Sequence, residues 1–352
     1  MYRRVTTVSQ SLRDALTRLP KVELHVHLEG TMLSDTLLEL AHKNGIAAPP
    51  QSYSYENLTG FLDVFWFVQS VLRTREDWAM LAYESVLQAA SNGVVYNEVF
   101  FTPARHMRGG MALGDIVAGI DDGLSAGEHE TGTTTRLIYD IDREFGPAAA
   151  VEQMEILLDL RCRNTQGVGR VIGIGMDSTE RNVDPATFAT AYAMASKAGL
   201  RRTAHQGEDS PAAAIRVALD VLGCERIDHG ITILDDPVLT KSAVDRQIAL
   251  TVCPSANVRI NPDRCPALSE HPFPKMREAG LLATLNTDDP ALTELSLGLE
   301  YTNVANAYGY EWKTMVQIAS DGVTASWLDG DDKHRIHGLI DAADASINGA
   351  LA

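Results

Sequence analysis

The sequence predicts an α/β fold, a (β/α)8 TIM barrel with a helical insertion after the first strand. Eight short apolar runs alternate with longer segments of helical pattern, as parallel βα units do. A count of eight favours a closed barrel over an open, doubly wound sheet. The chain has 352 residues, which is long for a compact domain, but α/β barrels reach this size as one domain.

The predicted strands are short and apolar, and several end in a histidine or an acid. They are Val22–His27, Val94–Phe101, Thr135–Ile141, Val171–Asp177, Arg202–His205, Arg226–His229, Ile248–Val252 and Leu282–Asn286. No linker, low-complexity run or internal repeat interrupts the βα alternation. We therefore predict a single domain over residues 1–352.

Segments with a helical pattern lie between most of these strands. Examples are Ala150–Cys162, Pro185–Lys197, Ser210–Leu222 and Pro237–Asp245. Two helix starts are marked by a proline at the first helical position and a polar N-cap: Asp184 with Pro185, and Ser210 with Pro211. Two helix ends are marked by glycines, Gly199 and Gly223.

The connection after the first strand is unusually long, running from His27 to Val94. It contains the aromatic-rich stretch "YSYENLTGFLDVFWFVQSVL". Insertions after barrel strands lie on the catalytic face, so we interpret Tyr55–Leu72 as a candidate lid. The alternative is a helix packed on the barrel flank.

Composition and charge limit the partners that this chain can have. Hydrophobic residues make up 45% and charged residues 22%, which is ordinary for a soluble globular protein with a large core. The net charge of -17 disfavours phosphate backbones and anionic lipids, so we expect no nucleic acid and no membrane partner. A small neutral substrate is compatible with this charge. The oligomeric state stays open, a homo-oligomer included.

The cysteines and the N-terminus point to a cytoplasmic protein. Cys162, Cys224, Cys253 and Cys265 lack CxxC spacing, so no zinc-ribbon or redox motif follows. The segment "MYRRVTTVSQSLRDAL" has no apolar core of a signal peptide, and no run of eighteen apolar residues occurs. We expect free thiols in a reducing cytoplasm.

Two histidines stand one residue apart in the first predicted strand, within "PKVELHVHLEG". Side chains alternate between the faces of a strand, so His25 and His27 point the same way. Two imidazoles on one face of a buried strand need partners. A metal ion and ordinary hydrogen bonds both remain open.

Polar groups also stand at the ends of three other predicted strands. They are His205 and Glu208 in "TAHQGED", Asp228 and His229 in "RIDHG", and Asp288 and Asp289 in "LNTDDP". Taken singly, such histidines are often structural, and two aspartates before a proline fit a turn or helix cap. Catalytic groups in barrels come from the ends of several strands, so together these residues predict one site at the barrel mouth.

Three imidazoles and a carboxylate are ligands that suit zinc or another late divalent metal. The candidate ligands are His25, His27, His205 and Asp288. A metal lowers the pKa of water toward neutrality. His229 is placed to take or hold the released proton, and Glu208 to protonate the substrate. Gly207 lets the backbone pass close to the substrate.

Five motifs in order make the chain resemble the adenosine/adenine deaminase family, a branch of the metal-dependent amidohydrolases. They are "PKVELHVHLEGT", "TAHQGE", "ERIDHG", "LTVCPSANVRI" and "LNTDDP", and the resemblance runs from about Leu19 to about Leu328. It implies a (β/α)8 barrel, one zinc ion per chain and hydrolytic deamination of a 6-aminopurine in purine salvage. The reaction would convert adenine to hypoxanthine and ammonia.

The resemblance also implies a role for each site residue. Zinc would be held by His25, His27, His205 and Asp288. Glu208 would donate a proton to purine N1, and His229 would orient and activate the water. Asp289 would contact the purine near N7.

Two positions resemble the adenine branch of the family rather than the nucleoside branch. Nucleoside deaminases carry an aspartate where this chain has Glu29, and a glycine where it has Ser178. We therefore expect a free base as substrate, with both residues in the substrate pocket. Gln206 replaces a commonly small residue, and "ALTELSLG" after Pro290 lacks the aromatic frequent in adenine deaminases. Adenosine or a modified 6-aminopurine remain alternative substrates.

Three other functions compete with this interpretation. A two-metal amide or ester hydrolase usually needs a bridging lysine, and none lies at the end of Val171–Asp177. The small zinc deaminase fold carries a PCxxC signature, which this chain lacks. An inactive barrel acting as a binding protein is the non-enzyme alternative, and the presence of every candidate ligand, acid and base argues against it.

Overall fold

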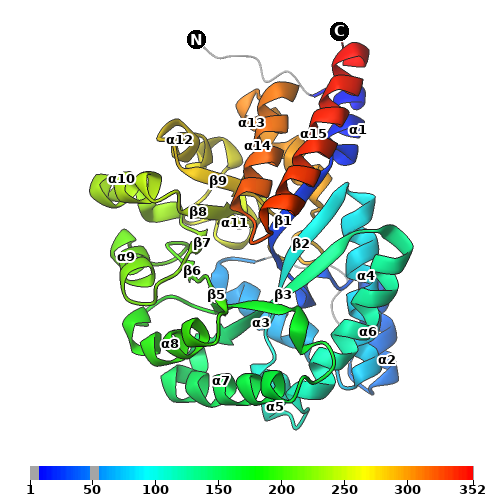
Figure 1. Ribbon diagram of the computed structural model, residues 1–352, viewed down its shortest axis with the longest axis vertical. Helices are drawn as coiled ribbons and strands as arrows, with labels where there is room; N and C mark the ends of the chain where they lie inside the picture. The colour runs from blue at the N-terminus through cyan, green and yellow to red at the C-terminus, as the bar shows by residue number, and fades with distance from the viewer. Residues whose placement is uncertain (1–7, 48–54, 352) are drawn as a thin grey trace.

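The computed structural model describes residues 8–47 and 55–351, and its centre is a ring of parallel strands with helices outside (Figure 1). The first four strands are β1 (Lys21–His27), β2 (Val94–Phe101), β3 (Thr134–Asp142) and β4 (Val171–Asp177). The fifth is interrupted, and its pieces are β5 (Arg201–Arg202) and β6 (His205–Gln206). The last three are β7 (Arg226–His229), β8 (Ala249–Val252) and β9 (Leu282–Leu285). Each strand lies within about one residue of its predicted bounds.

Single hydrogen bonds close the ring where the regular ladders stop. The ladders join β1 to β5 in one sheet and β6 to β9 in another. Across the interrupted fifth strand, the backbone N–H of Thr203 donates to Ile174 O at 3.0 Å. Between the last strand and the first, His27 N donates to Asp288 O at 2.8 Å, and Asp288 N donates to His25 O at 3.0 Å. The predicted (β/α)8 barrel is confirmed, and its closure brings Asp288 beside the two histidines of β1.

Helices cover the outside of the barrel and its two ends. Their bounds are α1 (Gln10–Arg18), α2 (Ser34–Lys43), α3 (Leu58–Gln69), α4 (Arg75–Ser91), α5 (Ala104–Arg108), α6 (Leu113–Thr131), α7 (Gly146–Cys162), α8 (Ala189–Lys197), α9 (Ala212–Asp220), α10 (Pro237–Asp245), α11 (Pro254–Ile260), α12 (Phe273–Glu278), α13 (Leu297–Tyr308), α14 (Trp312–Ala325) and α15 (Gly330–Leu351). The predicted bounds of α10 are correct.

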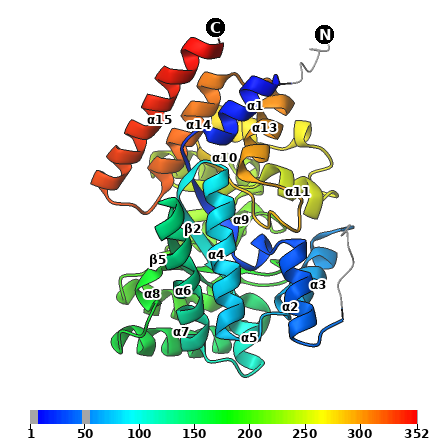
Figure 2. The ribbon, with the colours of Figure 1, turned by 90° about the vertical axis from the view of Figure 1, so that its right-hand side faces the viewer.

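The helical insertion after β1 is present, and it consists of a 3-10 helix, η1 (Glu29–Thr31), followed by α2 and α3. Figure 2 shows α2 and α3 next to each other, on the side of the molecule away from α15. The side chain of Asn57 caps α3 by accepting from Gly60 N at 3.1 Å. The Tyr55 hydroxyl donates to Leu292 O at 3.1 Å and ties the start of the segment to the loop after β9.

One of the two helix starts marked by a proline differs from the prediction, and α7 begins at Gly146 instead of the predicted Ala150. Asp184 caps the 3-10 helix η4 (Pro185–Phe188) by accepting from Ala186 N, as expected. Ser210, however, is not the N-cap of α9, because α9 begins one residue later and Pro211 occupies the cap. The hydroxyl of Ser210 instead donates to the buried carboxylate of Glu180. A distant acceptor therefore overrides the local capping preference.

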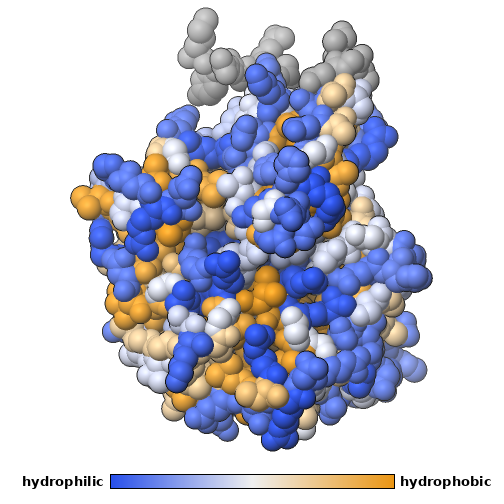
Figure 3. Space-filling view, viewed as in Figure 1, coloured by the Kyte–Doolittle hydropathy of each residue, from blue (hydrophilic) through white to orange (hydrophobic). Residues whose placement is uncertain are grey.

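The surface is mixed in polarity. The face seen in Figure 3 is mostly hydrophilic, with smaller hydrophobic areas between the polar groups. Within the described ranges, the helices are too short or too polar to cross a bilayer. The four cysteines are free, as predicted, with Cys162 exposed and the other three buried.

Candidate active site

Most of the predicted site residues surround one cavity at the C-terminal ends of the barrel strands. Its walls include His27, Ser178, His205, Glu208, His229, Asp288 and Asp289. Helix α3 covers it with Leu58, Phe61, Leu62 and Phe65, and the cavity volume is about 30 Å³. That space holds little more than water, so a purine needs the cavity to widen. The movement of Tyr55–Leu72 as a lid stays a prediction.

A larger cavity lies elsewhere in the described part of the chain. Its volume is about 580 Å³, and its lining includes Arg136, Arg161, Arg201 and Trp327. It contains none of the predicted site residues. Size alone therefore does not locate the chemistry here, whereas converging titratable side chains do.

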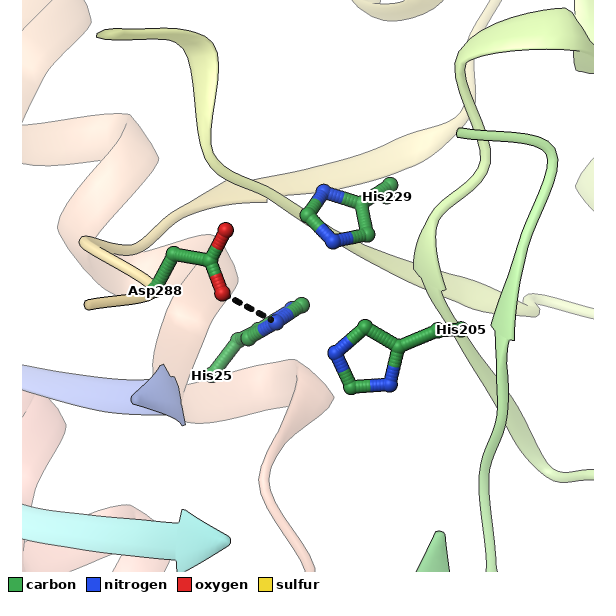
Figure 4. A group of neighbouring side chains, drawn as sticks. All are labelled: His25, His205, His229 and Asp288. Atoms are coloured by element: carbon green, nitrogen blue, oxygen red, sulfur yellow. Dashed lines mark ion pairs between the residues drawn. The ribbon is translucent and has the colours of Figure 1, made fainter. Parts of the chain in front are cut away.

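Four predicted metal ligands converge at the small cavity. Asp288 Oδ1 lies 3.3 Å from His25 Nε2 and 3.4 Å from His27 Nε2. His27 Nε2 lies 3.1 Å from His205 Nε2. A fifth group, His229, lies beside them, since His25, His205, His229 and Asp288 each place one ligand atom within 4.8 Å of the others (Figure 4). This group of four contains His229 in place of the predicted His27, which belongs to two groups of three, one with Asp140 and His205 and one with Asp288 and Asp289.

Hydrogen bonds at Nδ1 determine which ring nitrogen of His25 and of His205 carries the hydrogen. His25 Nδ1 lies 3.1 Å from Thr251 O, and His205 Nδ1 lies 3.1 Å from Met176 O. A backbone carbonyl only accepts, so each Nδ1 carries the hydrogen and each Nε2 presents a lone pair to the centre. Metal-ligating histidines have this arrangement. His25 Nε2 is buried without a hydrogen-bond partner, as a free ligand atom would be.

The centre of the cluster favours a positive charge. Burial opposes charging of His27, but Asp289, Asp288 and Asp140 outweigh it and raise the pKa of His27 well above its usual range. Asp140 lies 3.9 Å from His27 Nδ1. His27 Nε2 and His205 Nε2 are close enough for a hydrogen bond in the absence of a cation. The donor set therefore fits a divalent metal.

Backbone strain gathers at the same strand ends. Ser178, His229 and Asp288 have φ values of 70°, 62° and 65°, in the left-handed region. For residues with a Cβ atom this conformation costs roughly 1–3 kcal/mol each, and it is typical of functional sites. The barrel holds these residues against that cost because their positions at the cavity depend on it.

Glu208 follows β6 in a tight turn that sequence reasoning did not explain. The buried carboxylate of Glu180 accepts from the backbone N–H groups of Gly207, Glu208 and Asp209, at 2.7, 3.0 and 3.2 Å. Gly207 does not line the cavity; its φ of +79° and the close approach of Ile215 explain the glycine. Glu180 was missed because nothing local in "GMDSTE" links it to a turn so far along the chain.

Burial raises the pKa of the Glu208 carboxyl well above its usual range, and the negative charges of Asp288, Glu180 and Asp209 add to the effect. Its Oε2 lies 3.6 Å from His229 Nε2. Burial and the neighbouring His25 lower the pKa of His229 to about 4. A carboxyl that keeps its proton and an imidazole that stays neutral are suited to acid and base roles.

Of the two positions that resemble the adenine branch, Glu29 is buried and Ser178 is half-buried. Glu29 Oε1 accepts from Thr102 N at 2.8 Å, whereas Glu29 Oε2 is buried without a hydrogen-bond partner. Glu29 does not line the cavity as it stands. The Ser178 hydroxyl lines it but donates to Asp142 Oδ1 at 2.7 Å. Asp289 Oδ1, like Glu29 Oε2, is buried and unpartnered.

One polar residue of the cavity was not predicted. Asp177, at the end of β4, lines the cavity, and its Oδ1 has no hydrogen-bond partner. Burial and the charge of Asp142 raise the pKa of Asp177 to about 7. Its other oxygen accepts from the Thr102 hydroxyl at 2.6 Å. Its position at the end of a predicted strand was a signal that sequence reasoning could have used.

Comparison with known proteins matches this geometry to one family. The family model described as adenosine deaminase matches residues 20–343. An adenine deaminase from Streptomyces coelicolor is 36% identical over 329 residues, covering 92% of this chain and 94% of its own length.

Two solved structures resemble the whole chain. An adenine deaminase from Arthrobacter aurescens superposes with a TM-score of 0.86 at 32% identity, covering 92% of this chain and 98% of its own. An amidohydrolase from Burkholderia ambifaria, with bound Zn, has a TM-score of 0.83 at 30% identity and covers 97% of both chains.

Proposed function

Because the chain belongs to the adenosine deaminase family, we propose that it hydrolyses adenine to hypoxanthine and ammonia. One observation carries the proposal. Imidazoles with their lone pairs turned inward, a carboxylate and the raised-pKa carboxyl of Glu208 converge on one cavity. An inactive binding protein would have no need for an acid, a base and metal ligands in this arrangement.

We propose that His25, His27, His205 and Asp288 hold one zinc ion. The Nε2 atoms of the three histidines and Oδ1 of Asp288 form a nitrogen and oxygen donor set of the kind that zinc accepts. A zinc ion held there supplies Lewis acidity and brings the pKa of water toward neutrality. The same donors suit other late divalent metals, so metal analysis is part of the test.

Glu208 is the proposed general acid. Its raised pKa favours the protonated carboxyl, which can donate to N1 of the purine ring. Protonation of N1 withdraws electrons from C6 and favours addition of water at that carbon. His229, neutral and beside Glu208, is the proposed residue that orients and activates the water. Asp289, with a buried and unpartnered oxygen, is the proposed contact of the purine near N7.

Glu29 is the proposed reason for a preference for the free base. Its unpartnered Oε2 can accept a hydrogen bond from N9–H of adenine, a donor that adenosine lacks. Leaving a buried polar group unpaired costs roughly 1–3 kcal/mol, or about tenfold to a hundredfold in specificity. A ribose would also compete for the space that the longer side chain of glutamate occupies. Ser178 lines the cavity, and its hydroxyl donates to Asp142.

Ammonia release from adenine and from adenosine tests the proposal in one protein preparation of measured zinc content. We expect kcat/KM for adenine to exceed that for adenosine at least about tenfold. A better rate with adenosine would overturn the interpretation of Glu29. Release from neither, with zinc bound, would point instead to a substituted 6-aminopurine, which the same assay can measure.

A further inference from the structure

A chain of hydrogen bonds leads into the acid and base from outside the cavity. It starts at the backbone N–H of Phe273, the first residue of α12, which lies 3.1 Å from His271 Nδ1. His271 Nε2 lies 3.3 Å from Asn257 Oδ1. Asn257 Nδ2 then lies 3.0 Å from Glu208 Oε1 and 3.1 Å from His229 Nδ1. All of these side chains are buried.

The donor and the acceptor of each hydrogen bond in this chain follow from the bond between Phe273 and His271. A backbone N–H can only donate, and the N–H groups of a first helical turn have no partner within the helix. His271 Nδ1 must therefore accept from Phe273, and the ring hydrogen is on Nε2. Burial, with a contribution from the nearby His229, lowers the pKa of His271 to about 3, so a second ring proton is absent near neutral pH.

The orientation of the Asn257 amide follows next. His271 Nε2–H requires an acceptor, so Asn257 turns Oδ1 toward it and Nδ2 toward the cavity. The amide has two hydrogens and faces two acceptors, Glu208 Oε1 and His229 Nδ1. Both hydrogens are used, and both partners must accept.

We propose that His271 and Asn257 are positioning residues that decide which atom of Glu208 and of His229 carries a proton; this inference rests on the proposed function. Glu208 Oε1 accepts from Asn257, so the acidic proton is on Oε2, on the side of His229. His229 Nδ1 accepts too, so the hydrogen of the neutral ring is on Nε2. The motif "LTVCPSANVRI" thereby gains a role through Asn257.

The hydrogen on His229 Nε2 also decides whether His27 or His229 is the remaining metal ligand. A histidine binds a metal through a nitrogen lone pair, and His229 Nε2 has none when its hydrogen is there. His25 and His205 carry the hydrogen on the other ring nitrogen, because their Nδ1 atoms donate to carbonyls, and their Nε2 lone pairs are free to bind a metal. His229 is therefore kept out of the ligand set that its position would otherwise allow, and His27 takes that place.

Two variants of matched shape test the proposal. In His271→Gln, the amide can still accept from Phe273 and donate to Asn257. In His271→Met, a side chain of similar length has no hydrogen to donate. We expect the Gln variant to keep kcat within about threefold of wild type. We expect the Met variant to lose roughly tenfold to a hundredfold in kcat, with KM and zinc content unchanged.

Equal kcat in the Met variant and wild type would overturn the proposal. Equal losses in both variants would also overturn it, because packing and not donation would then be the role of His271. Should the Met variant not fold, the wild-type protein provides a second test. Nitrogen-15 NMR of histidine-labelled protein, with and without zinc, reports which ring nitrogen carries the hydrogen.

The NMR expectation is specific to two of the ten histidines. His229 and His271 should both carry the hydrogen on Nε2 and leave Nδ1 unprotonated. The signals are identified from variants that lack each ring. A hydrogen on His229 Nδ1 in the wild-type protein would refute the inference. The NMR measurement needs no turnover. A protein that releases no ammonia from adenine would therefore contradict the proposed function, while the assigned positions of the ring hydrogens could still be tested.

Discussion

The backbone N–H of Glu208 donates to the side chain of Glu180 at 3.0 Å, and both residues are buried. The two oxygens of Glu180 also accept from Gly207, Asp209, Ser210 and the Gln206 amide. One carboxylate from the loop after β4 therefore holds the entire turn that carries the proposed acid. These donors and the charge of Arg143 outweigh burial and lower the pKa of Glu180, so it stays ionised.

Glu180→Gln should reduce kcat roughly tenfold to a hundredfold while zinc content stays normal. The amide nitrogen of glutamine would face backbone N–H donors, and the turn would shift away from the substrate. Steady-state kinetics and elemental analysis make the measurement. Arg181→Gln is the matched control, because Arg181 is 56% exposed and contacts the same turn through Asp209. A control that loses as much activity as Glu180→Gln would refute the special role of Glu180.

Glu208→Gln should lower kcat by about a hundredfold to ten-thousandfold, the usual contribution of general acid–base catalysis. Glutamine keeps the shape and the contact with Asn257 but has no acidic proton. Zinc content should equal that of the wild type, since Glu208 is outside the proposed ligand set. Turnover near the wild-type rate would exclude Glu208 as the acid.

Elemental analysis of four alanine variants tests the metal site. Wild type should hold about one zinc per chain, and His25→Ala and His27→Ala should lose most of it. His229→Ala should keep its zinc while losing turnover. His129→Ala, on the exposed surface of α6, is the control and should change neither. Zinc lost from His229→Ala but kept by His27→Ala would reverse the proposed ligand set.

Glu29→Asp should shift the substrate preference toward adenosine. The shorter aspartate side chain leaves room for a ribose and weakens the hydrogen bond to adenine N9–H. We expect the ratio of kcat/KM for adenine to that for adenosine to fall at least about tenfold. An unchanged ratio would show that specificity depends on other residues.

A stability prediction concerns Lys21 at the start of β1. Its buried ammonium group donates to Thr17 O, Leu19 O and Asn92 O, at 3.1, 2.8 and 2.6 Å, and so caps the C-terminal ends of α1 and α4. Lys21→Met should destabilise the fold at neutral pH by several kcal/mol, because each abandoned carbonyl costs about 1–3 kcal/mol. Denaturant unfolding measures the change.

The contribution of Lys21 to the free energy of unfolding should also depend on pH. Burial lowers the pKa of Lys21 from 10.5 to about 7, despite the opposing charge of Glu23. Between these values the unfolded chain binds a proton that the folded chain does not, so stability rises with pH across that window. Wild type should therefore gain stability relative to Lys21→Met from about pH 7 to pH 10. A difference that is constant with pH would contradict the lowered pKa.

The sequence by itself determined the barrel and the location of its site. Strand bounds could be predicted because buried parallel strands are short apolar runs between helical patterns, as Val94–Phe101 and Val171–Asp177 show. The site could be located because barrel geometry brings the ends of such strands to one mouth. His25, His205 and Asp288 follow this rule and meet there.

Only the tertiary structure decided which partners those residues have. Glu180 binds a turn about thirty residues away, and His271 orients Asn257 from another helix start. Ser210 does not cap α9, because its hydroxyl forms a stronger hydrogen bond with the buried carboxylate of Glu180. Hydrogen bonds between segments distant in the chain have no periodic signature in the sequence, and their geometry depends on how the loops pack. The protonation pattern of the site is therefore a property of the folded barrel.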